Sequence, residues 1–256
     1  MTCQRPRLVV EHMRAVWTAC ALLVVSARLA SAGPGGLNLG WSDCGGLPPS
    51  LSRAFDCNTN SGTFTLVGSF IAPSSVIAAS GIVSILNMQS AGVFLPAWWR
   101  MAPGLCRAGS LATNFDFMNG PWTCYDYWQG GASGSIVMGF PAGNRTTITV
   151  VAALPAGSPL ITSIPEGDEV YAFKAIINAA KSTGLGACAG CQTGAGICMS
   201  SLTIKQPTGT PGGDRYISAP GMRNTAIWQG GIGADYYCAV TPVRNTTWGS
   251  IKALYR

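Results

Sequence analysis

Residues 135–153 read SIVMGFPAGNRTTITVVAA, and this stretch shows on a small scale how the whole chain is built. Two runs rich in β-branched residues, Ser135–Phe140 and Thr146–Ala153, flank a cluster of Pro, Gly and Asn. Such runs are typical of strands, and the cluster between them is typical of a turn. The same pattern recurs in five more predicted strands: Phe64–Ile71, Gly81–Met88, Val170–Asn178, Ile197–Lys205 and Asn224–Trp228.

Many short strands separated by turn residues, with no regular alternation of strand and helix, predict an all-β fold. We expect an antiparallel β-sandwich of the jelly-roll or immunoglobulin-like type, held by disulfides and with few short helices. Residues 33–50 are rich in Gly and Pro and are expected to form a loop. No charged or low-complexity linker divides residues 33–256, so one domain is expected there.

Helix is expected at only two places. One is a turn near Leu95–Met101, and the other is a short C-terminal helix in Ser250–Tyr255. The spacing of three between Trp248, Ile251 and Leu254 would give the C-terminal helix one apolar stripe. That stripe fits docking on the sandwich, or a sorting signal that another protein binds.

The N-terminal part has the pattern of a secretory leader. Residues 13–32 contain an early arginine, the apolar run Ala19–Val25 and small residues at a cleavage position. The apolar run is shorter than the roughly 20 residues of a membrane span. We therefore expect residues 1–32 to be removed, with Met13 as an alternative start, and the product to be secreted, periplasmic or on the cell surface.

Charge excludes some classes of function. The chain of 256 residues has a net charge of +6, which falls to +3 for residues 33–256. No run of Lys and Arg that would follow a phosphate backbone is present, so no nucleic-acid partner is expected. The only histidine, His12, lies in the leader, and this excludes a Ser-His-Asp triad, a Cys-His pair and histidine-ligated metals in the mature protein.

An even number of cysteines in an exported protein predicts disulfides. Pairing of sequence neighbours would give Cys44–Cys57 and Cys106–Cys124 and leave the connectivity of the rest open. A zinc or redox site at Cys188-Ala-Gly-Cys191 is the alternative, disfavoured by its glycine-rich flanks. The eight mature cysteines are Cys44, Cys57, Cys106, Cys124, Cys188, Cys191, Cys198 and Cys238.

Carboxylates are the remaining candidates for catalysis. Asp116 and Asp126 flank Cys124 and would suit a glycoside hydrolase if their carboxyl groups faced each other at about 5–10 Å. The alternative, which we favour, is that both aspartates cap backbone turns.

Asp56, Asn58 and Asn60 are spaced like the start of a calcium-binding loop. The pattern breaks where Ser61 replaces the tight-turn glycine and Val67 replaces the closing glutamate. A structural Asn-rich turn is therefore the preferred interpretation, and no metal or other cofactor is expected.

Aromatic residues are the candidate ligand contacts. Exposed aromatic rings mark binding surfaces, and Asp126, Asn119 and Gln129 nearby would bond sugar hydroxyls. The alternative is that the rings fill the core beside the disulfides. The candidates are Trp98, Trp99, Trp122, Tyr127 and Trp128.

A short repeat links two parts of the chain. Trp128-Gln-Gly-Gly131 recurs as Trp228-Gln-Gly-Gly231, and Asn144-Arg-Thr-Thr147 has a near echo at Arg244-Asn-Thr-Thr247. Because the similarity does not extend over a domain, we attribute it to similar turn chemistry rather than to duplication.

The segments LNLGWSDCGG (37–46), FDCNTNSG (55–62), GACAGC (186–191) and NTTWGSIKALYR (245–256) resemble those of a poorly characterised group of bacterial exported proteins. The resemblance implies export and a β-rich fold, and it carries no known activity. We expect a non-enzymatic binding or structural module that contacts an extracellular glycan or a cell-surface component. A secreted carboxylate-dependent glycoside hydrolase and a surface-assembly or adhesion subunit are the alternatives.

Overall fold

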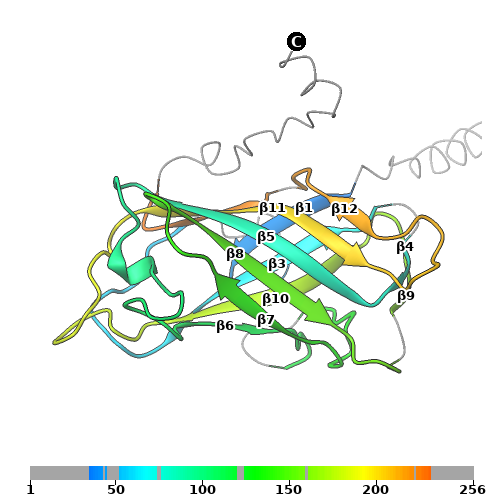
Figure 1. Cartoon of the computed structure of the whole chain (residues 1–256), viewed down its shortest axis with the longest axis horizontal. Coiled ribbons are helices and arrows are strands. Elements are labelled where there is room, and N and C mark those ends of the chain that lie inside the picture. The colour runs from blue at the N-terminus through cyan, green and yellow to red at the C-terminus, as the bar shows by residue number, and fades with distance from the viewer. Residues whose placement is uncertain are drawn as a thin grey trace, which may run out of the picture. The chain divides into compact units, whose positions relative to one another are not determined.

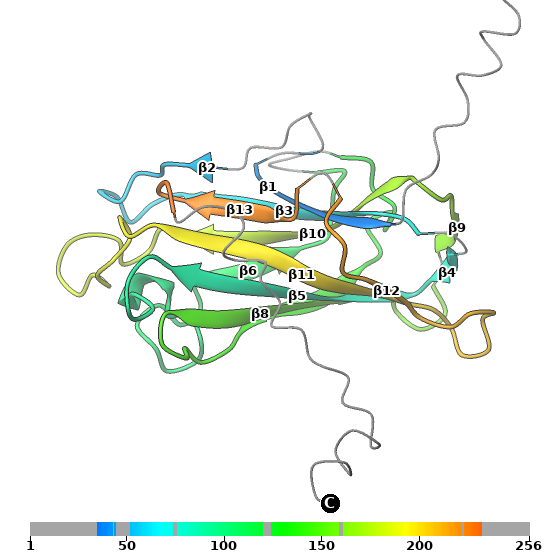
Figure 2. The same ribbon diagram turned by 90° about the horizontal axis from the view of Figure 1, so that it is seen from above.

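Two layers of β-sheet pack face to face (Figures 1 and 2). The computed structural model describes residues 35–42, 44, 52–73, 76–119, 124–158, 161–221 and 223–231. These residues all belong to one unit, Pro34–Arg256. The predicted leader, its alternative start, Trp122, Cys238, the near echo at 244–247 and the predicted C-terminal helix lie outside the described residues.

The first layer, which we call sheet A, has four strands. Their order across the sheet is β1 (Gly36–Trp41), β3 (Thr63–Ile71), β10 (Glu169–Asn178) and β6 (Leu111–Asn114), and every neighbouring pair is antiparallel.

The second layer, sheet B, has seven strands, and its only parallel pair among the described residues is β2–β13. Strand β12 (Arg215–Ile217) pairs with β11, and a separate two-stranded ribbon joins β4 (Val76–Ala79) to β9 (Ile161–Ile164). The other strands of sheet B follow the order β2 (Ser52–Arg53), β13 (Thr225–Trp228), β11 (Ala195–Lys205), β5 (Gly81–Ser90), β8 (Arg145–Ala153) and β7 (Ser133–Met138).

The predicted all-β sandwich is confirmed. All seven predicted strands are present, as β3, β5, β7, β8, β10, β11 and β13, within a few residues of the expected bounds. The expected turn near Leu95–Met101 contains η1 (Ala97–Trp99), a short 3-10 helix.

The expectation that residues 33–50 form only loop is wrong, because β1 lies within them. Leu37, Leu39 and Trp41 alternate into the core, as a strand requires. A side chain at Gly36 would lie 2.4 Å from the Cα of Gly221, so the glycine permits a second segment to pass against the strand.

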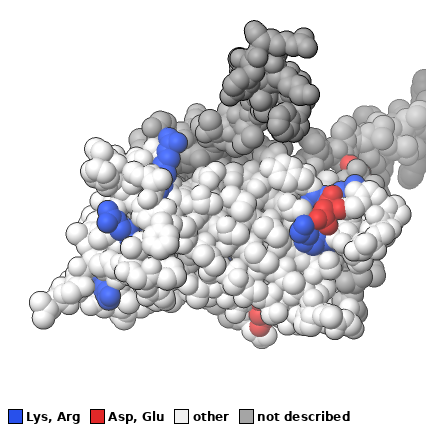
Figure 3. All heavy atoms as spheres, in the orientation of Figure 1, with Lys and Arg blue, Asp and Glu red and all other residues white. Residues whose placement is uncertain are grey.

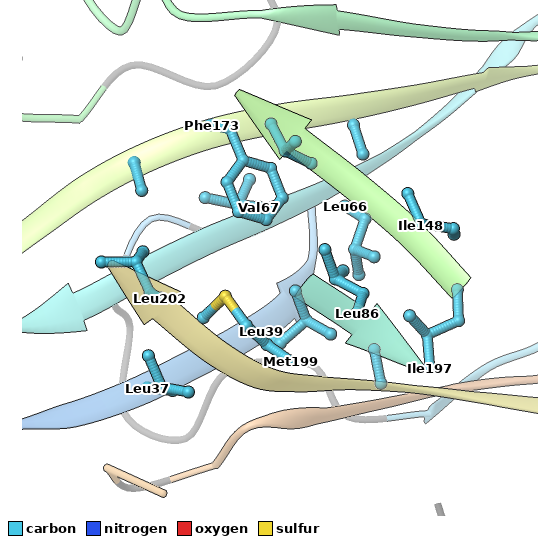
Figure 4. Packing of buried hydrophobic residues seen from close by; sticks show 14 of the residues in the cluster. Leu37, Leu39, Leu66, Val67, Leu86, Ile148, Phe173, Ile197, Met199 and Leu202 are labelled. Carbon is cyan, nitrogen blue, oxygen red and sulfur yellow. The ribbon is translucent and has the colours of Figure 1, made fainter. Parts of the chain in front are cut away.

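The core lies between the two layers (Figure 4). Leu39 and Leu66 of sheet A and Leu86, Met199 and Leu202 of sheet B are all buried there. Burying such side chains is the main favourable term in forming a sandwich.

One glycine of the core has a specific packing role. Strand β10 carries a bulge between Tyr171 and Phe173 where it pairs with β3, and the Phe173 ring covers Gly68. A Cβ atom at Gly68 would lie 2.3 Å from the ring, so the position accepts only hydrogen.

The two Trp-Gln-Gly-Gly segments form the same turn. The amide of Gly131 donates to the Trp128 carbonyl at 2.9 Å, and the amide of Gly231 donates to the Trp228 carbonyl at 3.1 Å. The central Gln and Gly have φ angles of 49° and 70° in the first turn and 51° and 70° in the second. Two positive φ angles define a type I′ turn, so similar turn chemistry accounts for the repeat.

Disulfides join segments far apart in the sequence, through Cys44–Cys124, Cys57–Cys191 and Cys106–Cys188. Pairing of sequence neighbours is therefore wrong, because the strand order brings distant loops together at the ends of the sandwich. The two cysteines of Cys188-Ala-Gly-Cys191 form separate bridges, which rules out a zinc or redox site there. Cys198 is disulfide-bonded as well.

Candidate functional site

Three of the five aromatic candidates are core residues. Trp98, Trp99 and Trp128 expose 0%, 0% and 2% of their surface, so their rings do not form a ligand surface. The Trp98 indole donates to Ser182 Oγ at 2.9 Å, and the Trp128 indole donates to the Ala172 carbonyl at 3.2 Å. Large aromatic rings with satisfied N–H groups are typical of cores.

Trp98 and Trp99 belong to an aromatic cluster centred on Trp228. The centroids of their rings lie 4.8 and 5.2 Å from that of Trp228. Phe55 stacks on the other side of the cluster, with a centroid distance of 4.2 Å to Trp228. These tryptophans therefore pack in the core, which was the alternative to their contacting a ligand.

Tyr127 is the candidate that the structure brings to the surface. Its hydroxyl donates to Asp168 Oδ2 at 2.8 Å, which fixes the ring. Burial, together with this hydrogen bond to a carboxylate, raises the pKa of Tyr127 to about 12. The hydroxyl therefore remains a donor at every physiological pH.

Tyr125, which sequence reasoning missed, extends this surface into solvent. Its ring is 71% exposed and meets the Tyr127 ring edge to face, with centroids 4.7 Å apart. The sequence shows Tyr125 two residues before Tyr127, but no pattern in it indicates which of the two rings is exposed. We call Tyr125, Tyr127 and Asp168 the tyrosine surface.

The tyrosine surface begins directly after a disulfide-bonded residue. Cys124, directly before Tyr125, is bonded to Cys44, and its amide donates to the Phe117 carbonyl at 2.9 Å. A fixed backbone lowers the conformational entropy that a ligand must remove on binding.

A buried lysine supports the same loop from inside. Lys174 is fully buried, and its ammonium donates to the Asp116 carbonyl at 2.7 Å and lies 4.9 Å from the centroid of the Phe117 ring. Desolvation by burial lowers the pKa of Lys174. Lysine in an alternating strand usually indicates a solvent-exposed position, so no sequence pattern indicated this role.

The two candidate catalytic aspartates cap turns. Asp126 is 9% exposed, and its two carboxylate oxygens each accept a backbone amide, from Trp128 and from Gly130, at 2.8 Å. Asp116 accepts the amides of Met118 and Asn119 at 2.9 and 3.0 Å. Hydrogen bonds from the side chain and the backbone of Asn119 lower the pKa of Asp116.

Gln129 and Asn119, predicted to bond sugar hydroxyls, also have turn roles. Gln129 is the residue with φ of 49° in the first Trp-Gln-Gly-Gly turn, and its side chain is exposed. The Asn119 amide donates to Asp116 Oδ2 at 3.0 Å.

The Asn-rich segment forms a structural turn next to β3. Asn60 bonds the backbone of Thr183 through both side-chain atoms, each at 3.0 Å, so its side-chain oxygen accepts a backbone amide. Within the described ranges, no group of three His, Cys, Asp or Glu side chains could hold a metal ion. A shallow cavity of about 460 Å³ lies beside Arg53, Asp56 and Thr59.

Helices long and apolar enough to cross a membrane are absent from the part of the chain that the structure describes.

Comparison with known proteins adds little. No protein-family model and no curated protein matches the chain. A similar solved structure is the second type II cohesin module from the cellulosomal adaptor ScaA scaffoldin of Acetivibrio cellulolyticus, at 12% identity and a TM-score of 0.26. The match covers 76% of this chain and 84% of that chain. A likeness this weak carries no conclusion about this chain.

Proposed function

We propose that the protein is an exported binding module whose ligand surface is the tyrosine surface. Export is supported by the disulfides, since such bonds form and persist in oxidising compartments. The observation that carries binding is Tyr125, which exposes 71% of its surface on a backbone held by the Cys44–Cys124 bridge. Functional residues are commonly placed on loops that a rigid scaffold positions.

The ligand class that fits this surface is extracellular carbohydrate. An exposed tyrosine ring offers an apolar face to the C–H groups of a sugar ring. Beside it, the Asp168 carboxylate offers an acceptor for sugar hydroxyls through its second oxygen, since Oδ2 already accepts the Tyr127 hydroxyl. Specificity in such sites comes from a few polar groups around an apolar contact.

Binding is favoured over hydrolysis by the state of the two aspartates. A glycosidase needs one carboxyl group with a raised pKa to act as the acid. The pKa of Asp116 is lowered instead, and both oxygens of Asp126 accept backbone amides.

A glycan array tests the proposal. The mature chain, prepared with its native disulfides, is compared with Tyr125→Ala and with Tyr216→Ala as the matched control, because Tyr216 is a second tyrosine that is 67% exposed. We expect Tyr125→Ala to weaken binding of a retained glycan at least tenfold, or about 1.4 kcal/mol, and Tyr216→Ala to leave it unchanged. An array without any retained glycan, or equal loss in both variants, would contradict the proposal.

A further inference from the structure

One end of the sandwich is built from four loops, which we call the braced end: residues 53–62, 91–110, 139–144 and 179–194. Two disulfides, Cys57–Cys191 and Cys106–Cys188, connect three of these loops. The buried Arg107 adds hydrogen bonds to the carbonyls of Trp98, Asn178 and Ala180. These contacts fix the loops relative to one another.

Large apolar side chains protrude from this end. Val93, Phe94 and Phe140 are 80%, 69% and 69% exposed, and Leu185 on a third loop is fully exposed. In a soluble domain such residues occur singly, so a group of them marks an interaction surface.

The loops 91–110 and 139–144 form one continuous platform. The amide of Leu95 donates to the Gly143 carbonyl at 2.8 Å, and the amide of Ser90 donates to the Asn144 carbonyl at 3.0 Å. The Asn144 side chain returns a bond to the Ser90 carbonyl at 3.0 Å. Hydrogen bonds therefore join the loops that carry Phe94 and Phe140, and these loops contain no charged residue between Ala91 and Trp99 or between Gly139 and Asn144.

Basic residues surround this platform. Arg100 belongs to the loop of Phe94, where its Nε donates to the Leu95 carbonyl at 2.8 Å, and Arg145 directly follows the loop 139–144. In Figure 3, the left-hand end of the visible face carries Lys and Arg and shows no acidic side chain. Among the described residues, the charged ones that reach the surface in the four loops and at their strand junctions are Arg53, Arg100, Arg145 and Lys181 against a single acid, Asp56, whereas Arg107 is buried.

We propose that the braced end docks on a bilayer surface rich in anionic lipid. Phe94, Phe140 and Val93 would enter the boundary between headgroups and acyl chains, while the basic residues around them face the headgroup phosphates. Stable membrane association takes two such signals, an apolar one and an electrostatic one, and this end combines both.

Co-sedimentation with vesicles tests the proposal. The mature protein is mixed with vesicles of phosphatidylcholine alone, or of phosphatidylcholine with phosphatidylglycerol, at low and at high salt. We expect binding to the anionic vesicles that falls at high salt, because salt screens exposed charges. The double variant Phe94→Ser, Phe140→Ser is expected to lower the partition constant at least about tenfold.

Tyr216→Ser is the matched control, because it removes an equally exposed aromatic ring from β12, outside the four loops. It should leave binding unchanged. The proposal is overturned if the unaltered protein stays in solution with both vesicles, or binds uncharged vesicles equally well. It is also overturned if the control lowers the partition constant as much as the double variant does. Binding of a partner protein at this end, without any binding to vesicles, would overturn it as well.

Discussion

Arg107 and Lys174 show how much of this fold depends on single polar side chains. Both are fully buried, and both donate hydrogen bonds to backbone carbonyls. Burial lowers the pKa of Arg107 to about 10, so the group remains charged at neutral pH. Its guanidinium lies 3.8 Å from the centroid of the Trp98 ring, a contact that offsets part of the cost of burying a charge.

Tyr127 gives a pH-dependent prediction at the same scale. Its pKa is 10 in the unfolded chain and about 12 in the folded protein, so between these values the unfolded state loses a proton that the folded state retains. Stability therefore falls as pH rises through this window, and the contribution is complete below pH 10.

Tyr127→Phe should make that fall shallower and should remove the tyrosinate absorbance that titrates near pH 12. Denaturant unfolding across the window, together with an ultraviolet titration, measures both effects. Identical pH profiles for the two proteins would contradict the assignment.

At the scale of elements, Gly68 and Phe173 form a pair that joins β3 to β10. Gly68→Ala forces a methyl group into the space of the Phe173 ring, and overpacking of this kind costs about 1–3 kcal/mol. The free energy of unfolding in urea measures the loss.

Adding Phe173→Leu to Gly68→Ala should recover part of that loss, because the smaller side chain vacates the space. Gly62→Ala, at a position with no atom within 4 Å but with φ of 99°, is a control for backbone strain alone. Loss in the double variant equal to the sum of the two single losses would contradict a direct contact.

The long strands could be predicted from the sequence, and of those with four residues or fewer only β13 was. Strand β8 carries its own alternating pattern over nine residues. Strands β2, β4, β6, β9 and β12 have two to four residues, which is too few for periodicity to register. In strand β1 large apolar residues alternate with smaller ones, but its glycines are typical of a loop in the sequence. The structure explains Gly36, because Gly221 packs closely against it.

The site was predicted less well than the strands, for a physical reason. Tryptophan suits both a core and a sugar-binding surface, so Trp98 and Trp128 carried no signal of their burial. Disulfide pairing depends on which loops the strand order brings together, and local sequence does not contain that order. Turn capping by Asp116 and Asp126, the alternative to catalysis, depends only on residues close in the sequence. It could therefore be predicted, and the structure contains these capping hydrogen bonds.

At the scale of the whole molecule, the disulfides allow a quantitative comparison. Cys44–Cys124 and Cys106–Cys188 are separated by 80 and 82 residues. If each bridge acts mainly by restricting the unfolded chain, its removal should cost roughly 2–5 kcal/mol, and the two losses should be nearly equal.

The paired variants Cys44→Ser, Cys124→Ser and Cys106→Ser, Cys188→Ser test this in denaturant unfolding. If removing Cys106–Cys188 lowers the free energy of unfolding clearly more, the extra loss would come from the native packing around Arg107. No loss in either variant would contradict a stabilising role for both bridges.

The connectivity of these bridges also bears on how the protein matures. A chain that crosses a membrane from its N-terminus presents Cys57 to an oxidant while Cys191, its native partner 134 residues later, is still inside. Cys44 is then the nearest thiol, and any Cys44–Cys57 bond formed at that stage must be reopened by thiol–disulfide exchange. Production of the native protein therefore depends on a disulfide isomerase or a redox buffer as well as on an oxidant, and yield should follow isomerase supply.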